Sequence, residues 1–115
     1  MPNKIETIIC FLACAKNGII WSSCSPDFGA QGVVDRFKQI EPKVLITCDY
    51  YYYNGKKINI LDKVDQILKE ISSIKNVIAY NYNKKEKEDL KNFINFEETL
   101  NCNLNENFER FEFDH

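Results

Sequence analysis

The sequence predicts an α/β fold built on a parallel sheet, and three observations support this. Helical and extended patterns alternate along the chain through residue 80. The runs at residues 44–47 and 77–80 are short, apolar and rich in β-branched side chains, as is typical of strands in parallel sheets. The amphipathic stretch between them is long enough for a crossover helix. This order is that of a βαβ unit, so we expect parallel strands joined by right-handed crossovers.

The first expected element is a helix over residues 5–16, which is apolar on almost every side. Ala13 and Ala15 are strong helix formers, and Asn17-Gly18 supplies a left-handed stop. A helix that is hydrophobic all round is normally buried, so we expect it to pack inside a larger body. A short buried strand is expected next, over residues 19–23.

The next unit is a turn followed by a helix. Residues 26–29 predict the turn, with Asp27 as the cap of a helix over residues 30–40. The apolar stripe of this helix, at three- and four-residue spacing, consists of Val33, Val34, Phe37 and Ile40. Pro42 ends it, because the residue before a proline is disfavoured in helical geometry. The strand at residues 44–47 has the composition of an interior strand.

A hairpin follows that strand. The four tyrosines at residues 50–53 precede Asn54-Gly55, and this pair predicts an extended segment closed by a type I′ turn. An amphipathic helix is expected over residues 61–71, ahead of the strand at 77–80.

The pattern changes in the last third of the chain. We expect a helix over residues 84–96 with Leu90, Phe93 and Ile94 facing inward. The asparagine-rich residues 101–107 predict a loop, and residues 101–115 are the part least expected to be ordered. No internal repeat or domain boundary is found, so the 115 residues are treated as one unit.

Composition excludes several classes of partner. The chain is 44% hydrophobic and 28% charged, with a formal net charge of -2. This balance gives no electrostatic basis for binding nucleic acid or an anionic membrane. The longest apolar stretch, residues 8–15, is too short to cross a bilayer, and the N-terminus lacks the pattern of a signal peptide. We therefore expect a cytoplasmic protein.

The residues alone predict no catalytic site and no metal site. The five cysteines contain no Cys-x-x-Cys pair, and the one histidine is His115. No glycine-rich phosphate loop is present. Cys24 lies between two serines but has no histidine partner, so packing is the expected role of the cysteines.

The carboxylates do not suggest a catalytic pair either. Nothing in the spacing of Asp27, Asp35 and Asp49 brings them together. Asp35 is expected to form a local ion pair with Arg36, and Trp21 and Phe28 are expected in the core.

Two motifs resemble a known family. They are WSSCSPDFG at residues 21–29 and DRFKQIEPKVL at residues 35–45. Both recur almost unchanged in the acetoacetate–CoA ligases (acetoacetyl-CoA synthetases) of the AMP-forming, adenylate-forming acyl-CoA synthetase superfamily. The resemblance covers the chain nearly end to end. It implies that residues 1–115 are an interior fragment of the large N-terminal domain, a partial βαβ slice of its parallel sheet. FDH at residues 113–115 resembles the tripeptide just before the family's phosphate-binding loop.

The resemblance implies an ATP-dependent ligase. Intact members activate acetoacetate as acetoacetyl-AMP, using ATP and Mg, and transfer the acyl group to CoA. This segment has neither the phosphate loop nor the lid of the family, so we expect it to bind no cofactor by itself and to be inactive alone. One alternative is a docking subunit that pairs with the remainder of the ligase as a separate chain. Another is a stand-alone flavodoxin-like binding or interaction module.

The resemblance suggests one binding loop, formed by Tyr53, Asn54, Gly55 and Lys56. In the related acetate–CoA ligases, an arginine- and glycine-rich loop at this place contacts the 3′-phosphate of CoA. Lys56 keeps the charge of the second arginine, and Lys57 adds another. Tyr53 replaces the first arginine and cannot form a bidentate phosphate clamp. The alternative is a hairpin turn with two solvated lysines. In the same relatives, the turn at residues 25–29 lies near the channel for the pantetheine of CoA.

Overall fold

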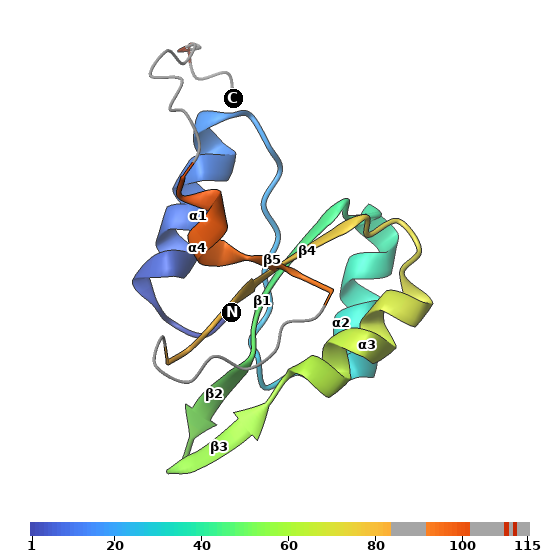
Figure 1. Ribbon diagram of the computed structural model, residues 1–115. Helices are drawn as coiled ribbons and strands as arrows, with labels where there is room; N and C mark the ends of the chain where they lie inside the picture. Colours follow the sequence, from blue (N-terminus) through green and yellow to red (C-terminus); the bar gives the residue numbers. More distant parts are fainter. Residues whose placement is uncertain (84–91, 102–109, 111, 113–115) are drawn as a thin grey trace.

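The computed structural model describes residues 1–83, 92–101, 110 and 112. Its elements, in chain order, are α1 (Ile5–Lys16), α2 (Ala30–Phe37), η1 (Lys38–Ile40), β1 (Val44–Cys48), β2 (Tyr50–Tyr53), β3 (Lys56–Asn59), α3 (Leu61–Glu70), β4 (Asn76–Tyr80), β5 (Ile94–Asn95) and α4 (Phe96–Thr99). The α/β fold with parallel strands is therefore confirmed. Figure 1 shows α1 and α4 to one side of the strands and α2 and α3 to the other.

Strands β1, β4 and β5 form a parallel sheet in the order β1-β4-β5. Val44 lies opposite Asn76, and Cys48 opposite Tyr80, so the carboxyl ends of β1 and β4 meet at one edge. The expected interior position of β1 is wrong for this sheet, because within the described residues β1 pairs only with β4. Its other side is a free edge.

The segment before α2 does not form the strand expected at residues 19–23. A strand exists only where its backbone is paired with another strand, and no described segment pairs with this one. Instead of being buried, Ile20 is 94% exposed. Gly18, with φ at 65°, does end α1 as expected.

The second helix ends differently from its predicted form. Regular α-helix stops at Phe37, and residues 38–40 tighten into the 3₁₀ turn η1. With three residues per turn instead of 3.6, the following side chains rotate off the apolar stripe, and Ile40 is exposed. Glu41 then adopts a left-handed φ of 45° before Pro42.

The prediction of a helix over residues 84–96 is wrong at the C-terminal end of that range. Ile94 and Asn95 form β5, in parallel register with Ile78 and Ala79, and Ile94 is exposed. The Asn95 side chain then caps α4 by accepting a 3.0 Å hydrogen bond from the Glu97 amide. Leu90 and most of the expected helix lie outside the described residues, as do most of the loop at 101–107 and Cys102.

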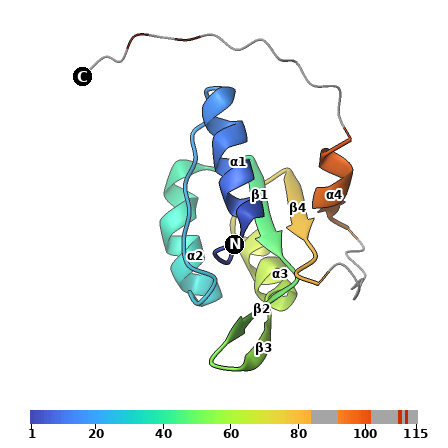
Figure 2. The same cartoon turned by 90° about the vertical axis from the view of Figure 1, so that its left-hand side faces the viewer.

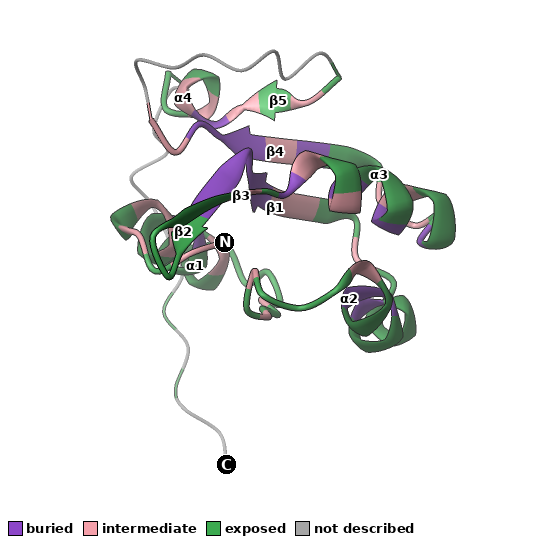
Figure 3. Cartoon of the chain, turned by 90° about the horizontal axis from the view of Figure 1, so that it is seen from below, coloured by how far each residue is buried: buried purple, intermediate pink, exposed green. Residues whose placement is uncertain are grey.

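Two clusters make up the core. Helices α2 and α3 pack through Val33, Val34, Phe37, Ile67 and Ile71. The second cluster lies around the strands and consists of Cys10, Cys48, Tyr51, Ile60, Val64, Val77, Tyr80 and Phe96. Figure 3 shows the buried residues concentrated on the strands and on the facing sides of α2 and α3.

Helix α1 contributes one buried residue, Cys10, to this core. Its other large apolar side chains are exposed: Ile5, Ile8, Ile9, Phe11 and Leu12. The expectation that this helix is enclosed is therefore not met by the described chain. Trp21 is half-buried and packs edge-to-face on Phe11 at 6.3 Å between ring centroids. No helix in the described part of the chain is long and apolar enough to span a membrane.

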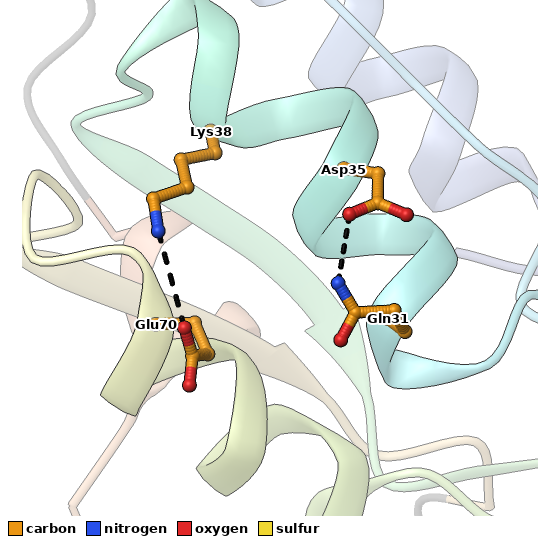
Figure 4. Close-up of polar contacts among 4 residues, drawn as sticks. All are labelled: Gln31, Asp35, Lys38 and Glu70. Carbon is orange, nitrogen blue, oxygen red and sulfur yellow. Dashed lines mark hydrogen bonds and ion pairs between the residues drawn. The ribbon is translucent and has the colours of Figure 1, made fainter.

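The polar contacts drawn in Figure 4 join exposed side chains of α2, η1 and α3. Lys38 and Glu70 approach to 3.9 Å, but both side chains are more than half exposed, so the pair contributes little stability. Asp35 accepts a 2.7 Å hydrogen bond from Gln31 one turn earlier, in place of the expected ion pair with Arg36. The guanidinium of Arg36 lies 5.7 Å from the ring centroid of Phe28, which is exposed rather than in the core.

Candidate functional site

The four residues of the candidate loop form the tip of the β2–β3 hairpin. Tyr53 and Lys56 are paired across the two strands. Asn54 and Gly55 have φ values of 47° and 72°, and positive φ at both central residues is what a type I′ turn requires. The expected turn is therefore present, and the hairpin projects from the body of the molecule (Figure 2).

All four tip residues are exposed, and Tyr53 is 61% exposed. No ion pair joins Lys56 to a described residue. Nothing lies within 4 Å of where a Cβ on Gly55 would be, so the turn is open to solvent. The tip thus exposes a phenol, an ammonium and two turn residues to solvent. Such a set can contact an anion, although it encloses none.

Lys57 is exposed, as the alternative of two solvated lysines expects, but its ammonium also has an aromatic neighbour. Its Nζ lies 3.8 Å from the ring centroid of Tyr50, which is cation–π geometry. Tyr50 packs in turn on Tyr52 and Tyr82, with ring centroids 5.8 and 5.2 Å away. On the far side of this cluster, Lys4 lies 4.0 Å from the centroid of Tyr82. The charge of Lys57 is therefore held against the hairpin face rather than at the tip.

The base of the hairpin is fixed by the buried carboxylate of Asp49, which the sequence analysis considered only as a possible member of a catalytic pair. Asp49 is 0% exposed, and its Oδ1 accepts hydrogen bonds from the amides of Tyr50 (2.7 Å) and Tyr82 (2.9 Å). Its main-chain carbonyl accepts a third, at 2.9 Å, from Ile60. Asp49 thus joins the carboxyl ends of β1 and β4 to the hairpin. The position of Asp49 directly after an apolar strand was the sequence signal that could have identified it.

The turn at residues 25–29 lies against the other face of the hairpin. Asp27 does not cap α2, whose N-cap is Gly29 with no side-chain hydrogen bond. Its Oδ1 instead accepts a 2.6 Å hydrogen bond from the Tyr51 hydroxyl, and its Oδ2 accepts one of 3.1 Å from Ser25. Lys63 of α3 donates to the Pro26 carbonyl at 3.4 Å. The turn at residues 25–29 and the β2–β3 hairpin, which the sequence analysis treated as separate features, are therefore in contact.

Hydrogen bonding and burial change the acidity of the groups near this junction. The hydrogen bond to Asp27 is the largest cause that raises the pKa of Tyr51 to about 12, and burial adds to it. Burial also raises the pKa of Cys24 and takes that of Cys48 to about 12. Both thiols are therefore protonated at neutral pH and poor nucleophiles. The described residues include no group of three or more histidine, cysteine or acidic side chains placed to hold a metal.

Known proteins match this chain in sequence and fold. Residues 1–106 match the family described as AMP-binding enzyme. The acetoacetyl-coenzyme A synthetase of Rhizobium meliloti (strain 1021) is 52% identical over 80 residues, which are 70% of this chain and 12% of that protein. The acetoacetyl-CoA synthetase of Macaca fascicularis is 41% identical over 96 residues, covering 83% of this chain and 14% of its own.

A solved structure agrees with the sequence matches. The acetoacetyl-CoA synthetase from Streptomyces lividans superimposes with a TM-score of 0.85 at 34% identity, over 95% of this chain and 17% of its own. The chain thus spans between about a tenth and a fifth of the length of the relatives it matches. The resemblance seen in the two sequence motifs is confirmed at the level of family and fold.

Proposed function

Because the chain belongs to the AMP-binding enzyme family, we propose that it forms part of an ATP-dependent ligase that activates acetoacetate as acetoacetyl-AMP and transfers the acyl group to CoA. The observation that carries this proposal is the 52% identity to a protein named acetoacetyl-coenzyme A synthetase. We propose the cytoplasm as its location, because free cysteines such as Cys10 and Cys48 persist in reducing compartments.

Within that ligase we assign residues 53–56 to the 3′-phosphate of CoA, and we call them the CoA-phosphate loop. The open, exposed tip fits such a group: Lys56 supplies a charge, and the Tyr53 hydroxyl can donate from the paired position on the facing strand. We assign no direct contact to Lys57, since its ammonium lies over the Tyr50 ring. When bound, CoA supplies the thiol that accepts the acyl group.

We assign ATP and Mg to the remainder of the ligase, supplied as a separate chain. Supporting this are three features that the described residues leave uncovered: the exposed apolar side chains of α1, the almost fully exposed Ile20, and the free edge of β1. Apolar surface and unpaired strand edges of this kind are typical of sites that another polypeptide covers. The occupant we propose is the part of the ligase that its long relatives have beyond the matched segment.

Reconstitution tests this proposal. The chain is mixed with the Rhizobium meliloti relative from which the matched 80 residues have been deleted, and pyrophosphate release is measured with acetoacetate, ATP and CoA. We expect activity from the mixture and none from either part alone. A complex without activity would contradict the ligase function, whereas failure to form a complex would contradict the docking assignment. Ile20→Asp is the matched variant, expected to keep the fold and lose the complex.

A further inference from the structure

One side chain connects the CoA-phosphate loop with the turn at residues 25–29. Tyr51 lies in β2, two residues before the loop begins, and is only 6% exposed. Its hydroxyl reaches Asp27 Oδ1 at 2.6 Å, and Ser25 occupies the other carboxylate oxygen. Hydrogen bonds to an ionised acceptor are shorter and stronger than neutral ones. Both oxygens of Asp27 are therefore engaged, which restrains the carboxylate as well as the tyrosine.

The two faces of β2 are held by different parts of the molecule. Side chains alternate across a strand, so Tyr50 and Tyr52 lie on the face opposite to Tyr51. On that face, Tyr50 packs on Tyr82 and under the ammonium of Lys57. On the other face, the Tyr51 hydroxyl is the polar contact between strand and turn. The first contact anchors the hairpin to the sheet, and the second sets its angle toward the turn.

This anchoring matters because an isolated two-stranded hairpin is marginally stable in water. The tip is exposed, and the described residues of the loop make no ion pair that would hold it. Its position is therefore determined by contacts nearer the base. Tyr51 is two residues from Tyr53, a separation of roughly 7 Å along a strand. Loss of its hydrogen bond would release the hairpin from the turn without unpairing β2 and β3.

We propose that Tyr51 is a positioning residue for CoA recognition. Its hydrogen bond to Asp27 fixes where Lys56 and Tyr53 stand relative to the turn at residues 25–29, so that a phosphate at the tip and the rest of the same ligand along the turn are bound together. This role rests on the proposed function of the loop. The ligand class is a nucleotide thiol that carries a 3′-phosphate, distinguished from its dephosphorylated form.

The test is an NMR titration that measures how tightly the full chain binds CoA and dephospho-CoA. The sequence predicts that the segment binds no cofactor by itself. The structure leads us to expect the opposite for CoA, because the whole loop lies within this chain and is exposed, and we expect the wild type to prefer CoA to dephospho-CoA. Tyr51→Phe, which keeps the ring and removes the hydroxyl, should reduce that preference about 3- to 10-fold while leaving dephospho-CoA binding unchanged. Tyr52→Phe is the matched control, because it makes the same change on the opposite face of the same strand. We expect it to bind as the wild type does.

Asp27→Ala, which removes both acceptor oxygens and leaves the strand intact, provides a second route for use if Tyr51→Phe does not fold. It should cause the same loss, and the double variant should lose no more than either single one, because both remove one interaction. Additive losses would overturn the positioning role, as would an unchanged preference in Tyr51→Phe.

Lys56→Ala separates this proposal from the function it rests on. If Lys56→Ala lowers the preference for CoA but Tyr51→Phe does not, the loop assignment stands and the positioning role of Tyr51 fails. If the wild type shows no CoA-dependent shifts in the hairpin up to millimolar ligand, or no preference over dephospho-CoA, the loop assignment fails and the positioning role fails with it.

Discussion

The hydroxyl of Tyr51 donates a 2.6 Å hydrogen bond to Asp27, which lies 24 residues earlier in the chain. Asp27 belongs to the turn that precedes α2, and Tyr51 to the hairpin that follows β1. The contact therefore connects the two ends of the α2–β1 unit. It also changes the chemistry of the phenol, because a neighbouring carboxylate disfavours its deprotonation.

Alkaline pH should weaken this contact. The Tyr51 pKa is raised from 10.0 to about 12 in the folded chain. Its stabilising effect is therefore complete below pH 10 and lost as the pH rises through 12. We expect Tyr51→Phe to lower the free energy of unfolding by about 1 kcal/mol at pH 9, since the acceptor is solvent-exposed. Urea denaturation from pH 9 to 11.5 should show this difference shrinking.

A constant or widening difference over that range would contradict the assignment. The pKa of Tyr80 is also raised to about 12, chiefly by burial, and this tyrosine titrates in both proteins. Its effect cancels in the comparison between wild type and Tyr51→Phe, so the difference reports on Tyr51.

The Cys48 thiol should be inert in the folded chain. It is fully buried at the end of β1, and burial raises its pKa from 9.0 to about 12. At pH 8 this lowers the thiolate fraction roughly 1,000-fold, and only the thiolate reacts. Mass spectrometry after brief iodoacetamide treatment should find Cys48 unmodified in the native chain and modified in urea. Equal labelling in both states would show that β1 is not protected as described.

The α2–α3 contact should account for a large share of stability. Ile67 is buried against α2, and truncating it to alanine should cost about 2–5 kcal/mol in the free energy of unfolding. Ile20→Ala is the matched control: the same atoms are removed from an almost fully exposed site, so the change should stay within about 0.5 kcal/mol. Similar losses in both variants, measured by urea denaturation, would contradict the described packing.

Local signals made most elements predictable. The Asn54-Gly55 pair specified its turn because positive φ at both positions is a property of those two residues. Helix α3 begins where its apolar spacing begins, and Gly18 ends α1, for equally local reasons. The candidate loop was predictable as a contiguous stretch, since its four residues need no long-range contact to be neighbours.

The errors concern features that depend on distant residues. Residues 19–23 have strand-like composition, but a strand needs a pairing partner, which the described chain does not offer them. Ile94 fits a helical stripe, yet pairing with Ile78 of β4 makes it a strand. The contact of Asp27 with Tyr51 depends on the fold itself, so local capping rules assigned Asp27 to the wrong partner.

The type I′ turn predicts how stability changes when Gly55 is replaced by alanine. Gly55 has a φ of 72°, which costs an alanine about 1–2 kcal/mol, and no atom lies within 4 Å of the added Cβ, so backbone strain alone is responsible. Gly32→Ala is the same substitution inside α2, where the nearest atom is 3.8 Å away and alanine is the better helix former. We expect the free energy of unfolding to fall for Gly55→Ala and to rise by up to about 1 kcal/mol for Gly32→Ala. If the free energy of unfolding measured by urea denaturation does not fall for Gly55→Ala, the left-handed turn that positions Lys56 is not formed in solution.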